Sequence, residues 1–153
     1  MSKHAKPGSV TAVLVLLILI AVYQLVVGAT AIVGAVAIDA TNMADEAPAE
    51  AGAMLEAAED NIAGIYFGAA LCLVYAALAT ALAVMVGRGT PRARPWTIAV
   101  NTAFAVAGLA LMIPMIYGLG AVLSAVFAFV VVGLMFTSGA RSHFAATGAP
   151  TTG

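Results

Sequence analysis

Apolar and polar positions divide this chain into long uncharged stretches separated by short charged segments. The uncharged stretches cover residues 7–38, 61–87 and 95–140. A helix that crosses a membrane needs about 20 apolar residues, because about 30 Å of hydrocarbon must be crossed at 1.5 Å per residue. The first two stretches therefore predict one span each, and the third is long enough for two.

The third stretch contains residues that interrupt a helix near its middle. Pro114, Gly118 and Gly120 lie there, and proline ends or kinks a helix while glycine relaxes the turn. We therefore predict that this stretch forms two helices joined by a tight turn. The spans are expected to be helical because unpaired backbone groups are costly in lipid. The predicted fold class is all-α, an integral membrane four-helix bundle formed by residues 1–141. The four predicted spans lie at about residues 10–37, 62–87, 95–117 and 120–140.

The amino-acid composition agrees with a membrane protein. Apolar residues make up 63% of the 153 residues and charged residues only 8%, whereas a soluble domain has about 25% charged residues. A soluble fold of this size could not bury so much apolar surface. The composition also excludes a disordered chain, a collagen, a disulfide scaffold and a nucleic-acid-binding protein.

The charged residues are separated by sign along the chain. All seven acidic residues lie from Asp39 to Asp60. The six basic residues are Lys3, Lys6, Arg88, Arg92, Arg94 and Arg141. Four spans place every basic residue on one side of the membrane. Short loops rich in Lys and Arg stay on the cytoplasmic side. We therefore predict a multi-pass protein of the bacterial plasma (inner) membrane with cytoplasmic N- and C-termini, an acidic outer loop at 39–60 and a mobile cytoplasmic tail at 142–153.

The first span shares some features with a secretory signal peptide. Lys3 and Lys6 precede it, and residues 35–37 read Ala-Val-Ala like a cleavage site. The apolar run is much longer than the roughly 7–15 residues of a signal peptide. We expect an uncleaved anchor, and cleavage would leave three spans.

Small residues indicate the faces by which the spans are expected to pack, because helices in lipid associate through close contact and a few hydrogen bonds. The candidate packing residues are Gly28, Gly64, Gly68 and Gly108. Packing within one chain is favoured over dimerisation.

A few polar residues lie at membrane depth. The main ones are Gln24, Tyr75, Thr80, Asn101 and Ser124. Similar depths predict hydrogen-bonded pairs of Gln24 with Tyr75 and of Asn101 with Thr80, each worth about 0.6–2 kcal/mol. We interpret these residues as structural, and the alternative is a narrow polar path or a small-ligand site.

The acidic segment is predicted to be partly helical. Pro48 suits the first turn of a helix, and the helix formers after it could continue into the second span. Glu56, Glu59 and Asp60 share one face at spacings of three and four, where like charges repel. We expect a solvated outer face, with a protein partner or a Ca²⁺ or Mg²⁺ site as alternatives.

Several kinds of chemistry lack the residues they need. No charged residue lies inside a predicted span, unlike in proton-coupled transporters. His4 and His143 lie near the chain ends, where they cannot form a bis-histidine haem site, and Cys72 is the single cysteine, read as a packing residue. We therefore expect no enzyme activity and no cofactor.

Three features of the chain are shared with a known group of proteins. They are the Ala-, Val- and Gly-rich spans, the segment PRARPWTIAVN at 91–101 and the closing FTSGARSHF at 136–144. With these features the whole chain resembles small, largely uncharacterised four-span integral membrane proteins of high-GC, actinobacterial-type bacteria. The resemblance implies a four-span membrane fold and assigns no functional residue.

Three functions follow as hypotheses. The first is an accessory or assembly subunit that binds other membrane proteins through its small-residue faces and acidic loop, with Arg88, Arg92 and Arg94 near anionic lipid headgroups. The second is a homo-oligomeric pore or small permease, holin-like or cation-favouring, with the intramembrane polar residues along its path. The third and weakest is a cation sensor that uses the three acidic residues of the outer helix.

Overall fold

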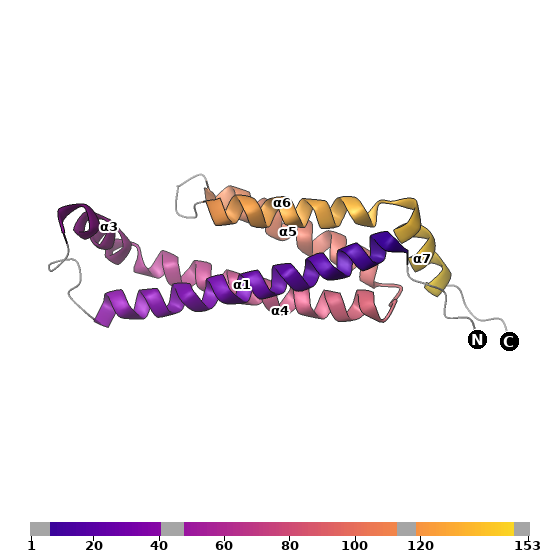
Figure 1. Cartoon of the computed structure of the whole chain (residues 1–153), viewed down its shortest axis with the longest axis horizontal. Coiled ribbons are helices and arrows are strands. Elements are labelled where there is room, and N and C mark those ends of the chain that lie inside the picture. Colours follow the sequence, from indigo (N-terminus) through magenta and orange to yellow (C-terminus); the bar gives the residue numbers. More distant parts are fainter. Residues whose placement is uncertain (1–6, 41–47, 113–118, 149–153) are drawn as a thin grey trace. The chain divides into compact units, whose positions relative to one another are not determined.

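The computed structural model describes residues 7–40, 48–112 and 119–148, and these residues form helices and turns without any strand (Figure 1). The helices are α1 (Gly8–Ala40), α3 (Ala49–Asp60), α4 (Ile62–Gly87), α5 (Ala93–Met112), α6 (Leu119–Met135) and α7 (Ser138–Gly148). The all-α prediction is therefore confirmed for the part of the chain that the structure describes.

Among the described residues, two helices are long and apolar enough to cross a membrane. α1 has 33 residues and α4 has 26, so at 1.5 Å per residue each exceeds the roughly 30 Å of bilayer hydrocarbon. Val122–Met135 and Ser138–Ala146 give a third span only if two segments bent by 64° count as one. These helices support a membrane protein, while the four-span bundle stays a prediction.

The chain divides into two compact units. The larger unit consists of residues 1–21 and 77–153, and the smaller unit consists of residues 22–76. α1 and α4 each contribute one half to each unit, and the units are described separately below.

In the smaller unit, α1 and α4 approach each other through a glycine. Gln24, Gly28 and Ala35 are buried along one face of α1. A Cβ atom added to Gly28 would lie 3.0 Å from the side chain of Leu73 and 3.1 Å from the carbonyl oxygen of Ala69. The absence of a side chain at Gly28 therefore lets the two helices pack closely, as helices do in lipid.

In the larger unit, the first half of α1 buries an apolar stripe. The stripe consists of Val10, Val13, Leu17 and Ile20. Steps of three and four residues keep these side chains on one helix face. Leu14 also contacts the end of α4, since its Cδ1 atom lies 3.3 Å from the Cβ position of Gly87.

α5 and α6 run side by side in the same unit (Figure 1). The buried residues of α5 are Ala93, Thr97, Asn101 and Ala105. Ala105 forms a buried cluster with Ala125 and Ala128 of α6. Such small side chains allow two helices to come close together.

Two predicted connections fall partly outside the described residues. Pro114 and Gly118, which were expected to turn the third stretch, lie outside them, whereas Gly120 belongs to α6. Within the acidic segment 39–60, Asp39 lies in the last turn of α1 and residues 41–47 lie outside the described part.

α3 begins beside Pro48, at the residue expected to open a helix. Pro48 is the N-cap residue with φ −53° and ψ 147°, and its carbonyl oxygen accepts a hydrogen bond of 2.8 Å from the N–H of Gly52. The φ that the proline ring imposes suits this position. α3 ends at Asp60, and the single residue Asn61 separates it from α4.

The fourth predicted span ends earlier than expected. We predicted a helix over residues 120–140, but α6 ends at Met135 and the chain bends into α7. The Thr137 hydroxyl donates to the carbonyl oxygen of Leu134 at 2.8 Å and accepts from the N–H of Ala140 at 3.4 Å. A threonine that bonds the backbone in this way favours the start of a new helix over continuation of the old one.

The predicted C-terminal tail is helical over part of its length. We expected residues 142–153 to lack periodic structure, but α7 continues to Gly148. Ala140 and Phe144 lie four residues apart and are both buried, so burial of one helix face explains the difference. Residues 149–153 lie outside the described part.

Candidate functional site

The end of the larger unit where α6 meets α7 brings together side chains that are distant in the sequence. Arg94, near the start of α5, donates a hydrogen bond of 3.1 Å from Nε to the carbonyl oxygen of Met135, the last residue of α6. A cation at a helix C-terminus is favourable, because the final carbonyl groups point outward without backbone partners. Arg94 therefore joins α5 to the end of α6.

Two arginines converge on one aromatic ring at this place. The Cζ atom of Arg94 lies 5.7 Å from the centroid of the Phe136 ring, and that of Arg141 lies at the same distance. Both distances are within the range of a cation–π interaction. We call Arg94, Phe136 and Arg141 the arginine–phenylalanine cluster.

The cluster is open to its surroundings and has no carboxylate nearby in its own unit. Arg141 and Phe136 are exposed, Phe136 by 49%. Every acidic residue of the chain lies within residues 39–60, and therefore in the smaller unit. Apart from the Arg94–Met135 bond, neither guanidinium group makes a hydrogen bond or ion pair with another described residue.

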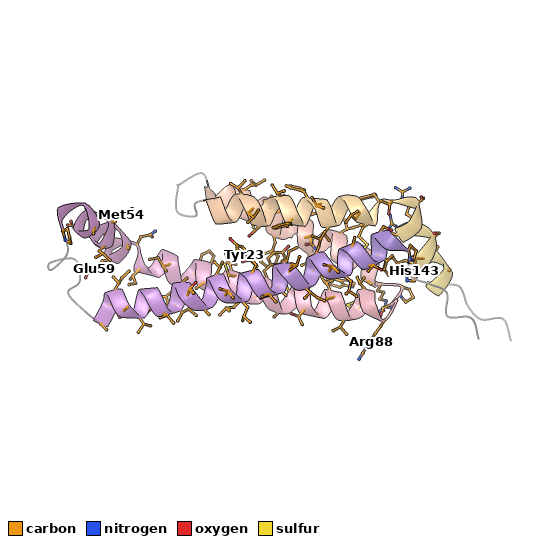
Figure 2. All side chains as sticks on the ribbon, viewed as in Figure 1. Tyr23, Met54, Glu59, Arg88 and His143 are labelled. Carbon is orange, nitrogen blue, oxygen red and sulfur yellow. The ribbon has the colours of Figure 1, made fainter. Side chains whose placement is uncertain are left out.

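The sequence predicted three arginines near lipid headgroups, and only one of them, Arg94, belongs to the arginine–phenylalanine cluster. Arg88 and Arg92 are exposed, while Arg94 is partly buried against α6. Figure 2 shows the Arg88 side chain extending away from the end of α4. Sequence reasoning missed Arg141 and Phe136, because only the α6–α7 bend brings them to Arg94.

Two polar atoms near this end are buried without a hydrogen-bond partner. They are Oγ1 of Thr97 and Nε2 of His143. His143 lies on α7 (Figure 2), and its ring meets that of Phe144 edge-on with centroids 5.2 Å apart.

The intramembrane polar residues differ in burial. Gln24, Tyr75 and Asn101 are at most 5% exposed, whereas Ser124 is half-buried and Thr80 is exposed. Each of the five takes part in a hydrogen bond or another polar or ring interaction.

One bond of this set is resolved in detail. The side-chain amide of Asn101 donates to the carbonyl oxygen of Thr97 at 2.8 Å, which is a contact within α5. The pairs Gln24–Tyr75 and Asn101–Thr80 stay predictions.

The four predicted packing glycines have different surroundings. Gly28 and Gly68 are buried. A Cβ on Gly64 would collide with the side chain of Asn61, whereas a Cβ on Gly108 would meet nothing within 4 Å. Only Gly28 therefore has a demonstrated close approach between two helices.

The acidic candidates for a cation site are separate and solvent-facing. Glu56, Glu59 and Asp60 are all exposed on α3. Among the described residues, no three His, Cys, Asp or Glu side chains come together closely enough to hold a metal ion. The site therefore gains no support from the structure. Met54 on the same helix is 78% exposed (Figure 2).

Comparison of the chain with protein-family models, with curated proteins and with solved structures finds no match.

Proposed function

We propose that this protein is a small membrane-embedded subunit of the bacterial plasma membrane that binds other membrane proteins as an accessory or assembly factor. Its termini lie in the cytoplasm and α3 lies outside. The proposal combines the membrane-spanning helices with a water-facing helix suited to docking.

The surface of α3 is the observation that carries the proposal. Met54 exposes 78% of its side chain on a helix whose described acidic residues are also exposed. A flexible, polarizable methionine side chain is common at protein-binding surfaces. The carboxylates of Glu56, Glu59 and Asp60 lie on a different face of α3 from Met54. They give the helix a negative charge that fits a basic segment of a partner protein, because opposite charges guide association.

The buried polar residues favour this function over a pore within one chain. Gln24, Tyr75 and Asn101 are almost fully covered by neighbouring residues and take part in interactions within the protein. A water-filled path would require exposed polar groups along its length. Polar residues packed in this way instead support helix association.

Cross-linking from α3 tests the proposal. A photo-reactive amino acid at Met54 should form a cross-link of reproducible mass in cells, and the joint change Glu56→Gln, Glu59→Gln and Asp60→Gln should weaken it. The matched control is the same amino acid at Val126, an exposed apolar position on α6. Absence of any protein cross-link at Met54 would contradict the proposal.

Flux measurements test the pore alternative independently. Purified protein in liposomes should give no ion flux above that of empty vesicles. Flux that depends on Gln24 or Asn101 would instead support the homo-oligomeric pore.

A further inference from the structure

We propose that the arginine–phenylalanine cluster binds a phosphate group, carried either by an anionic phospholipid headgroup or by a soluble phosphate anion. The binding site consists of Arg94 of α5 and Arg141 of α7, whose Cζ atoms each lie 5.7 Å from the centroid of the Phe136 ring. It is separate from the surface of α3 proposed to bind a protein partner.

The position of the two arginines along the chain indicates the depth of the site relative to a membrane. Arg94 directly precedes the uncharged stretch 95–140, and Arg141 directly follows it. α5 and α6 run side by side, so the chain returns to the end at which it entered. Both guanidinium groups therefore lie where apolar helix gives way to charged sequence, which is the headgroup level of a membrane.

No Asp or Glu side chain of the larger unit balances the charge at this site. Two guanidinium groups lie at 5.7 Å from one ring centroid, so their Cζ atoms are at most about twice that distance apart. The larger unit has all six basic residues of the chain and no acidic residue. A bound anion would offset the repulsion between the two arginines.

The hydrogen-bonding geometry favours phosphate as that anion. Met135 occupies only the Nε–H group of Arg94 and thereby holds its guanidinium group in place. The other N–H groups of Arg94 and those of Arg141 have no partner among the described residues. Arginine matches the oxygen atoms of phosphate with two parallel hydrogen bonds, which lysine cannot form.

Trp96 provides a local signal for the experiment. It is the only tryptophan of the chain, lies two residues after Arg94 and is 56% exposed. Phosphatidylglycerol or phosphatidylcholine with brominated chains quenches tryptophan on contact. Quenching of Trp96 in vesicles that contain both lipids therefore reports their relative affinity for this end of the protein.

The measurement is made in about 1 M KCl, where the Debye length is about 3 Å and long-range attraction is screened. Phosphatidylglycerol should bind in preference to phosphatidylcholine. Arg141→Gln should reduce the preference about tenfold, the effect of losing one hydrogen bond to a charged group. Phe136→Leu, which removes the ring but keeps an apolar side chain, should also reduce it. Arg88→Gln is the matched comparison, because it removes the same charge from an exposed arginine outside the cluster, and it should reduce the preference by less than Arg141→Gln does.

Inorganic phosphate distinguishes the two sources of the phosphate group. Displacement of phosphatidylglycerol by millimolar phosphate assigns the site to a soluble anion, and persistence of the lipid assigns it to a headgroup. Equal affinity for both lipids together with no effect of phosphate on Trp96 would overturn the proposal. An equal loss of preference in Arg141→Gln and Arg88→Gln would overturn it as well.

Discussion

At the scale of single residues, two glycines of α1 show how surroundings decide the effect of one methyl group. A Cβ on Gly28 would lie 3.1 Å from a backbone oxygen of α4, whereas a Cβ on Gly34 would meet nothing within 4 Å. Both glycines lie in the smaller unit and in the same helix.

Gly28→Ala should therefore destabilise the protein relative to Gly34→Ala. The expected difference in the free energy of unfolding is about 1–3 kcal/mol, the cost of overpacking where the Leu73 side chain and the Ala69 carbonyl oxygen must give way. Gly34→Ala gains helix propensity of up to about 1 kcal/mol. Unfolding of both variants in detergent checks the difference, and equal stability would show that α1 and α4 do not pack through Gly28.

Asn101 gives a second test at the same scale. It is fully buried, bonds the Thr97 carbonyl oxygen of its own helix and takes part in a further interaction, so Asn101→Leu should lower stability by about 1 kcal/mol, the net contribution of a buried hydrogen bond. Thr30→Val is the control, because Thr30 is exposed and bonds only carbonyl groups of its own helix. The same unfolding measurement should place Thr30→Val within about 0.5 kcal/mol of the wild-type protein. A stable Asn101→Leu protein would mean that the buried amide is not needed for packing.

At the scale of elements, the hydroxyl group of Thr137 bonds the backbone on both sides of the α6–α7 bend. Thr137→Ala removes the bonds to Leu134 and Ala140, at a cost to α7 of about 1 kcal/mol. Amide hydrogen exchange in residues 138–148 should become about fivefold faster, since opening of a helix scales with its local stability.

Ser142→Ala is the control for this variant. The Ser142 hydroxyl bonds only to the Gly139 carbonyl oxygen within α7 and is exposed. Exchange in this variant should match that of the wild-type protein. Unchanged exchange in Thr137→Ala would mean that burial of Ala140 and Phe144 alone holds α7.

At the scale of the whole molecule, the separation of charge predicts which segments face which side. All basic residues belong to the larger unit and all acidic residues to the smaller unit. Retention of Lys and Arg in the cytoplasm would place α3 outside and α7 inside.

Cysteine labelling checks this arrangement. In a Cys72→Ala background, Met54→Cys should react with a membrane-impermeant maleimide on intact cells, because Met54 is highly exposed. Ser142→Cys, also at an exposed position, should react only after the cells are opened. Labelling of both positions from the same side would contradict the proposed orientation and the four crossings.

The sequence indicated the helices more reliably than their ends. The expected spans near 10–37 and 62–87 match α1 and α4, because an apolar run of that length has few alternatives to a helix. The end of α6 was missed, since Thr137 lies in an uncharged stretch and its hydroxyl acts only through local geometry. Residues 142–148 were missed because the burial of Phe144 depends on the packing of α7.

Hydropathy and charge are properties that each residue carries wherever it lies, and they suffice to predict an all-helical membrane protein with its charges separated. The arginine–phenylalanine cluster is different, because Arg94 and Met135 are 41 residues apart in the chain. Their contact exists only after α5 and α6 pack side by side and the chain bends into α7. The linear pattern therefore indicated which segments are long and apolar enough to cross a membrane. The packing of the helices determined which polar groups meet at their ends, because that depends on distances in space rather than along the chain.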